Sequence, residues 1–307
     1  MSSHNIFLGI ALLVLSTWAL STQEASGKWL MQMSLPLFCL VFFRYAVHVV
    51  LVLAITLPKK GLAIFHSKSY KTQVIRGFTT MLITLVVFKA LSYLPQAEAT
   101  AIYFLAPLVV LCTAPWFLGE PSRLHRWIAA VVGFLGVLVI VRPGAGLDPV
   151  GVAYALLAAV MIAVQYMYTK KLAADDSQTT LLWTGVVGLL GGLVLVPFQW
   201  HESLAVLGDF SLWQWLVVIN VGVFGALGHL LQIKAYQHAP ASLLAPFSYF
   251  QIIAAAALGF VIWGQFPDVW AWVGILIVCG SGIAVTVVEW RHNQKVLKVV
   301  EKIIEEK

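Results

Sequence analysis

The stretch VFFRYAVHVVLVLAITLPKK, residues 41–60, decides the fold class of this chain. It is apolar for most of its length and ends in a basic turn at Lys59 and Lys60. About 20 such residues in a helix, each rising about 1.5 Å, cross the roughly 30 Å hydrocarbon core of a bilayer. The stretch therefore predicts a membrane-spanning helix, and it raises the question why Arg44 and His48 lie inside it, one helical turn apart.

The composition extends this pattern to the whole chain. Of the 307 residues, 61% are hydrophobic and 10% are charged, whereas soluble domains carry about 25% charged residues. The net charge of +6 is scattered over short loops, which argues against nucleic acid as a partner. The three cysteines lie in apolar runs without metal-ligand spacing, so we expect no metal and no other cofactor.

We expect an all-α integral membrane protein with ten transmembrane helices, bounded by polar residues, glycine and proline. The expected spans are residues 5–25, 36–57, 74–94, 97–118, 124–142, 150–172, 179–198, 212–236, 240–263 and 269–290. No lysine or arginine precedes Lys28, so the first apolar run is interpreted as a span and not as a cleaved signal peptide.

The basic residues fall on one side of this arrangement. With the N-terminus inside, the even-numbered loops and the tail hold nearly all of them, and the opposite side holds only Lys28 and Arg142. Because lysine and arginine concentrate on the cytoplasmic side, we expect both termini in the cytoplasm and the loop at residues 199–211 outside. The tail, residues 291–307, predicts a short amphipathic helix that lies on the membrane or pairs with a second copy; a solvated end is the alternative.

The chain also resembles itself at an offset of 145 positions. This shift aligns Lys89-Ala90 with Lys234-Ala235, Pro95 with Pro240, Gly119 with Gly264 and Trp127 with Trp272. It predicts two five-helix repeats, residues 1–145 and 146–290. Five crossings leave the chain on the far side, so the second repeat is inverted. Inverted repeats are typical of secondary transporters, because two equivalent halves can open a central site to either side.

Two segments of the first half, ALSYLPQAEATAIYFLAPLVVLCTAPWFLGE and RWIAAVVGFLGVLVIVRPG, carry a familiar pattern. Together with Arg44 and Arg76-Gly77, this pattern resembles the EamA-type branch of the drug/metabolite transporter superfamily. The second half repeats it in APASLLAPFSYFQIIAAAALGFVIWGQ, with Gln265 where the family usually has glutamate and with Pro246 earlier than Pro107. The resemblance covers roughly residues 5–290.

The resemblance implies two inverted five-helix repeats in a bacterial inner membrane, working by alternating access and often as an exporter. We expect the substrate to be a small polar metabolite, amino-acid-like or anionic, and the chain to be a monomer or homodimer. Uptake of a nucleotide-like or vitamin substrate is an alternative. A membrane enzyme or a channel would belong to other classes, but the sequence has neither clustered catalytic groups nor a filter-like loop.

Arg44 is the first candidate for a functional residue. A charge at membrane depth costs about 3 kcal/mol or more unless it pairs, reaches the interface or faces water. Arg44 is expected ~10 Å below the outer surface, with Lys89, Glu24 and Glu98 near the outer ends of their spans. Arg44 and Lys89 either form ion pairs with Glu24 and Glu98 or bind an anionic group of the substrate; Lys89 can instead extend to the interface.

The remaining candidates have both a functional and a structural interpretation. His48 is a candidate proton relay or a packing residue, and the coupling ion stays open. Pro107 and Pro246 free a carbonyl group in their helices, for a cavity or only for a kink, and His229 and Lys234 are candidates for an inner gate. The candidate lining of a central site, or else plain bundle core, consists of Trp18, Tyr103, Gln165, Tyr166 and Tyr249.

Overall fold

The computed structural model describes residues 3–118, 124–142, 146–172, 175–238, 244 and 247–305. Within these ranges the chain is helical and contains no strand. Eight of the described helices are long and apolar enough to cross a membrane, and two shorter apolar helical stretches accompany them, Gln96–Val110 and Phe250–Trp263. The expected all-α membrane class is therefore confirmed.

The first half of the chain contains helices α1 to α6. They are α1 (Ser3–Gln32), α2 (Leu37–Lys60), the 3-10 turn η1 (Gly61–Phe65), α3 (Tyr70–Tyr93), α4 (Gln96–Tyr103), α5 (Ala106–Leu118) and α6 (Leu124–Val141). The predicted end of the first span at residue 25 is wrong, because α1 continues to Gln32. Glu24 and Lys28 consequently lie inside this helix and not at its end or in a loop.

The second half contains helices α7 to α13. They are α7 (Pro149–Lys171), α8 (Ser177–Leu195), η2 (Val196–Gln199), α9 (Trp200–Leu207), α10 (Leu212–His238), α12 (Phe250–Trp263) and α13 (Val269–Glu305). The predicted loop at residues 199–211 contains the short helix α9, which was not expected from the sequence. The described part of the tail is helical as predicted, but it continues α13 without a break, because no glycine or proline follows Gly282.

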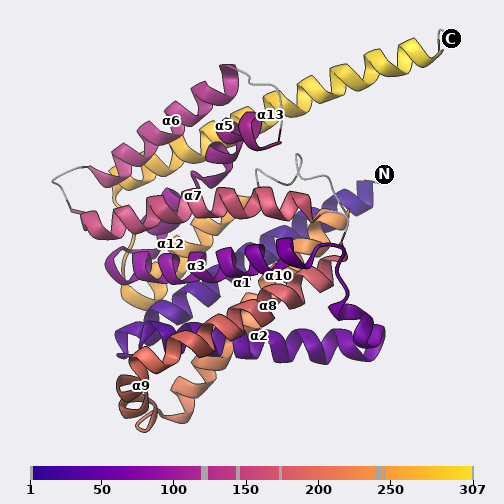
Figure 1. Ribbon diagram of the computed structural model, residues 1–307. Coiled ribbons are helices and arrows are strands. Elements are labelled where there is room, and N and C mark those ends of the chain that lie inside the picture. The colour runs from indigo at the N-terminus through magenta and orange to yellow at the C-terminus, as the bar shows by residue number, and fades with distance from the viewer. Residues whose placement is uncertain are drawn as a thin grey trace.

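Helix packing links the two halves of the chain. Helix α2 packs against α8, and α6 packs along α13 at one edge of the bundle (Figure 1). Helix α1 packs against α10 and α12, while α7 packs against α3 and α4; likewise α3 contacts α8 and α2 contacts α10. Both chain ends lie at one end of the bundle, and α9 lies at the other (Figure 1).

Glycines bring α2 and α8 close together. A Cβ atom on Gly188 would lie 2.5 Å from Cδ1 of Tyr45, and one on Gly185 would lie 2.7 Å from Cδ2 of His48. Glycine at these positions leaves room for the two rings, which are almost fully buried. Tyr45 and His48 are thus held in fixed positions by α8.

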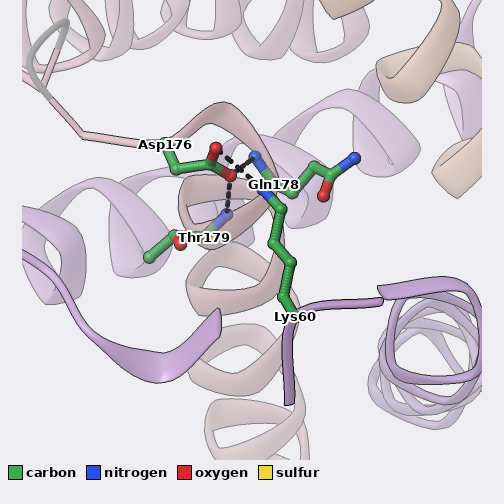
Figure 2. A network of polar contacts seen from close by, with 4 residues as sticks. All are labelled: Lys60, Asp176, Gln178 and Thr179. Carbon is green, nitrogen blue, oxygen red and sulfur yellow. Dashed lines mark hydrogen bonds and ion pairs between the residues drawn. The ribbon is translucent and has the colours of Figure 1, made fainter. Parts of the chain in front are cut away.

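The N-terminus of each of these two helices is bonded from the far end of the other, by α2 itself in one case and by η2, which follows α8, in the other. Lys60, at the end of α2, forms a 2.8 Å ion pair with Asp176, which also accepts hydrogen bonds from the backbone N–H groups of Gln178 and Thr179 at the start of α8 (Figure 2). At the opposite end, Oε1 of Gln199 accepts a 3.0 Å hydrogen bond from the backbone N–H of Phe38. The pair therefore has related contacts at both ends.

Candidate functional site

A cluster of buried polar side chains lies where α1, α2, α3, α4 and α12 meet. We call it the central polar cluster; its members are Gln23, Glu24, Arg44, Thr84, Tyr103 and Gln251. Each is less than a tenth exposed. Burying a polar group without a partner is unfavourable, so the hydrogen bonds inside this cluster determine what it can do.

Arg44 is held by two hydrogen bonds and one ring. Its Nη1 donates to Oγ1 of Thr84 at 2.7 Å, its Nη2 donates to Oε1 of Gln23 at 3.4 Å, and the guanidinium lies 4.7 Å from the Tyr45 ring centroid. Its Nε is buried and has no hydrogen-bond partner among the described residues. Since a guanidinium has five N–H donors, Arg44 keeps bonding capacity for a further group.

Thr84 positions both Arg44 and Tyr45. Its hydroxyl donates to the carbonyl of Thr80 at 2.9 Å, which uses its only hydrogen. It must therefore accept the bond from Arg44 and the 2.9 Å bond from the Tyr45 hydroxyl. This arrangement fixes the guanidinium against α3.

Glu24 is buried on the neighbouring side of the cluster. The Tyr103 hydroxyl donates to its Oε2 at 2.7 Å, and Nε2 of Gln251 donates to its Oε1 at 3.2 Å. Although both Glu24 and Arg44 are described, no ion pair joins them, since each is bonded to neutral groups instead. The cluster thus offers a carboxylate and a guanidinium that lie within electrostatic range of each other but form no direct ion pair.

The four charged residues expected from the sequence to lie near one another at the outer side of the membrane do not form a single group in the structure. Lys89 does not meet Arg44: it is half-buried, with its ammonium 5.4 Å from the ring centroid of Tyr93 on its own helix. Glu98 is buried, its Oε2 has no hydrogen bond within the described part of the chain, and its electrostatic partners include Lys28. Only Glu24 and Arg44 remain in the central polar cluster.

The side chain of His48 packs between its own helix, α2, and α8. It is 2% exposed, its Nε2 lies 3.3 Å from the carbonyl oxygen of Leu181, and its ring contacts Gly185 of α8.

The aromatic and amide candidates also differ in position. Gln165 donates to Oγ1 of Thr80 at 2.6 Å, one turn from Thr84 on α3. Tyr249 is buried, and its hydroxyl bonds none of the residues that the structure describes. Trp18 is 41% exposed and Tyr166 is 45% exposed, so neither is bundle core. Tyr166 nevertheless lies within electrostatic range of Tyr249, which places it beside the interior.

The proline and gate candidates are partly described. Helix α4 ends at Tyr103 and α5 begins at Ala106, one residue before Pro107, as expected for the hydrogen bond that Pro107 removes. Pro246 lies outside the described residues, as do most of the residues at the predicted start of the ninth span. His229 is half-buried on α10, and Lys234 is exposed further along the same helix.

Comparison with known proteins identifies the family. The model of the EamA-like transporter family matches the chain twice, over residues 7–142 and 149–287. The chain belongs to the EamA-like transporter family. It is therefore a multi-pass membrane protein of a transporter family.

Several proteins are similar to this EamA-like chain. The pseudopaline exporter CntI of Pseudomonas aeruginosa is 26% identical over 91% of this chain and 95% of its own length. The riboflavin transporter of Vibrio cholerae is 26% identical over 86% of this chain and 87% of its own. The S-adenosylmethionine uptake transporter of Rickettsia bellii is 28% identical over 59% of this chain and 61% of its own. These relatives are named as transporters of different compounds, in both directions.

A solved structure has the same fold as this EamA-like chain. It is 19% identical and matches with a TM-score of 0.60 over 95% of this chain and 99% of its own.

Sequence reasoning missed several members of the site. Gln23, Thr84 and Gln251 were not singled out, although Thr80 and Thr84 recur one turn apart on α3 and Gln251 opens an apolar helix. Glu24, Lys28 and Gln32 recur at every fourth residue of α1, a spacing that places them on one face. That spacing was readable, but the early predicted end of the first span hid it. No group of three or more residues that could hold a metal is found among the described residues.

Proposed function

We propose that this EamA-like protein is a secondary carrier for small zwitterionic metabolites, such as compounds with an amino-acid-like head. The observation that carries the proposal is the buried and unpaired couple of Arg44 and Glu24. In a low-dielectric interior, a carboxylate of the substrate would bond the free donors of Arg44, and an ammonium group would bond Glu24. A ligand that carries both charges compensates both buried groups at once.

The alternative interpretation is that the two charges only support the fold. Buried charges that serve stability are normally paired with each other, because an unpaired one is strongly unfavourable. Here Arg44 is bonded to Thr84 and Gln23, while Glu24 is bonded to Tyr103 and Gln251. Keeping two opposite charges nearby without a mutual ion pair favours a binding role.

We further propose ten membrane crossings in two inverted five-helix repeats, residues 1–145 and 146–290. The two family matches support this division. The packing supports it too. In the two repeats α1 corresponds to α7, α2 to α8 and α3 to α10. Exchanging the halves therefore turns the contact of α1 with α10 into the contact of α7 with α3, and the contact of α3 with α8 into the contact of α10 with α2, and all four contacts are present. The contacts at the two ends of the α2–α8 pair follow the same exchange.

In the proposed arrangement both termini lie in the cytoplasm of a bacterium and the substrate crosses the inner membrane outward. The distribution of lysine and arginine supports this orientation. Export is supported by the pseudopaline exporter, which matches most of the chain. Uptake is the second candidate, because the S-adenosylmethionine relatives are named as uptake transporters.

Glu24 is also the proposed coupling residue if a proton drives transport. It is the carboxylate of the central polar cluster, and it bonds α1 to both α4 and α12. A proton on Glu24 would compete with the ammonium group of a substrate for the same oxygens, which is the basis of exchange between the two.

Exchange in proteoliposomes tests the proposal. Vesicles containing the purified protein are loaded with one unlabelled compound from a panel of amino acids and related metabolites, and entry of the labelled compound is followed. A carrier gives saturable entry that is accelerated by the internal compound. Entry that rises linearly without acceleration would identify a channel, and conversion of the compound to a product would identify an enzyme; either result contradicts the proposal.

A further inference from the structure

A polar cavity opens at the end of the bundle opposite the chain termini (Figure 1), apart from the central polar cluster. It has a volume of about 320 Å³, which falls within the range of about 300–1,000 Å³ typical of small-molecule sites. We call it the outer cavity; its wall includes Lys28, Gln32, Tyr93, Leu94, Asp148 and Gln265. No member of the central polar cluster lies in this wall, so the two places are distinct.

The wall of the outer cavity contains a buried cation. Lys28 is 4% exposed, its Nζ donates to the carbonyl of Leu94 at 2.7 Å, and it lies 4.8 Å from the Trp263 ring centroid. An ammonium has three donors, and the hydrogen bond to Leu94 uses one of them. Lys28 therefore retains the capacity to bond an anionic group in the cavity.

The same wall contains a carboxylate with spare capacity. Oδ1 of Asp148 accepts hydrogen bonds from the backbone N–H groups of Val150 and Gly151, at 2.8 and 3.1 Å, and so caps α7. Within the described ranges no bond to its Oδ2 is present, and no ion pair joins Asp148 to Lys28. The outer cavity thus also has a cation and a carboxylate that form no ion pair with each other; Asp148 is exposed, and Lys28 lies within electrostatic range of the buried Glu98.

A polar stripe on α1 connects the two places. Glu24 of the central polar cluster, Lys28 and Gln32 lie at every fourth position, on one face of the helix. Successive members are therefore about 6 Å apart along the axis. Gln32 is held in place by Nε1 of Trp263, which donates to its Oε1 at 2.6 Å. A small ligand leaving Glu24 along this face would meet Lys28 next.

We infer that the outer cavity is a second binding site for a small zwitterion, with the carboxylate of the ligand on Lys28 and its ammonium on Asp148. The inference rests on the proposed function, because it makes the outer cavity a binding site on the transport path. The substrate would bind there before it reaches the central polar cluster, or after it leaves that cluster. The bond from Lys28 to the Leu94 carbonyl ties α1 to the turn between α3 and α4 and holds the ammonium group at the cavity wall.

The test uses a cysteine introduced in the wall of the outer cavity. Ser92 is exposed and lines the outer cavity, so the thiol of Ser92→Cys is accessible to reagents. Its labelling rate is measured in the purified full-length protein with two methanethiosulfonates, one bearing a sulfonate and the other a trimethylammonium group. The protein with native Ser92 gives the background from the native cysteines.

The rate ratio of the anionic to the cationic reagent reports the charges of the wall. Lys28→Gln should lower the ratio by about threefold or more, and Asp148→Asn should raise it by a similar factor, as expected for one charge at close range. Asparagine still caps a helix, so the second variant is expected to fold. Lys59→Gln, which removes an exposed lysine at the far end of α2, is the matched control and should change the ratio less.

Protection from labelling tests the class of ligand. Leucine carries both charges, 4-methylpentanoate only the carboxylate, and 3-methylbutylamine only the ammonium. Leucine should slow labelling of the introduced thiol more than either single-charge compound, and Lys28→Gln and Asp148→Asn should each abolish that difference. Equal protection by all three compounds, or none by leucine, would overturn the inference, as would rate ratios unchanged in both variants.

This result is independent of transport. If leucine protects the introduced thiol but no panel compound undergoes exchange in vesicles, the outer site stands as a binding site and the proposed carrier function fails. If exchange occurs but the protection pattern is absent, the outer site is wrong and the carrier function stands.

Discussion

Tyr103 on α4 donates a 2.7 Å hydrogen bond to Glu24 on α1, and Gln251 on α12 bonds the same carboxylate. One buried acid therefore joins two helices of the first half to a helix of the second half. Helix α4 is buried along its whole length, and it ends at Tyr103 itself, where Pro107 interrupts the helix. The interruption places the Tyr103 ring at the inner end of α4, against α1.

Replacing Tyr103 tests this bond. Tyr103→Phe keeps the ring but removes one hydrogen bond to a buried carboxylate, which should lower stability by about 1–3 kcal/mol. Thermal unfolding in detergent measures the effect. Tyr93→Phe, at a half-exposed tyrosine that stacks on Tyr154, is the control and should be close to neutral. Equal melting temperatures for Tyr103→Phe and the native protein would show that the bond contributes nothing.

Gly188 is predicted to be intolerant of any side chain. Gly188→Ala would place a methyl group 2.5 Å from the buried Tyr45 ring, whose hydroxyl bonds Thr84 beside Arg44. Overpacking of this kind destabilises by about 1–3 kcal/mol. Gly280→Ala meets nothing within 4 Å, and since alanine favours helix it should be neutral or stabilising. Similar melting temperatures for the two variants would contradict the close approach of α2 and α8.

The ion pair of Lys60 with Asp176 is expected to contribute little by itself. Both side chains are partly exposed, so Lys60→Gln should lower stability by about 0.5 kcal/mol. Asp176→Ala also removes the cap of α8 and should cost about 1 kcal/mol more. A double-mutant cycle of Lys60→Gln and Asp176→Ala separates the two contributions. A coupling energy well above about 1 kcal/mol would show that the pair is more than a surface contact.

Asp176 should also make stability depend on pH. Partial burial raises its pKa, but the hydrogen bonds from Lys60 and from the backbone N–H groups of Gln178 and Thr179 lower it more, and the pKa ends below its usual value. A depressed pKa in the folded protein gives stability that is present above the unfolded pKa of about 4 and is lost as the pH falls below it. Melting temperatures should therefore fall less steeply below about pH 4 in Asp176→Asn than in the native protein.

The control for this dependence is Asp209→Asn, in the exposed turn after α9. It should leave the acid profile of the native protein unchanged. Parallel profiles for Asp176→Asn and the native protein would show that the cap and the ion pair do not act through this carboxylate.

The membrane class and most helices followed directly from the sequence, because apolar length is the dominant signal in a bilayer. The boundaries that failed depend on tertiary contacts. Helix α1 continues through Gly27, which lies directly against the Phe88 ring, so this glycine serves close packing and does not end the helix. Helix α9 forms within the predicted outer loop and ends at Leu207, before Gly208, whereas the tail continues α13 because no glycine or proline interrupts it.

The site was predictable in part. Arg44 stood out as a charge in an apolar span, and its burial in the structure agrees with that reasoning. Its neutral partners did not stand out, because threonine and glutamine are ordinary residues in a helix and only the packing of α1 and α3 brings Gln23 and Thr84 to Arg44. Lys89 carried the same sequence signal as Arg44, but the register of α3 turns it toward Tyr93. Span positions alone do not distinguish such cases.

The most direct test of the central claim is the concentration dependence of exchange in proteoliposomes for Arg44→Gln and Glu24→Gln, normalised to the amount of folded protein. Loss of either charge should reduce the apparent affinity for a zwitterionic substrate by about tenfold or more, since each pairs with one end of the ligand. Lys59→Gln, at the exposed end of α2, should leave it unchanged. Unaltered affinity and rate in both Arg44→Gln and Glu24→Gln would contradict the account.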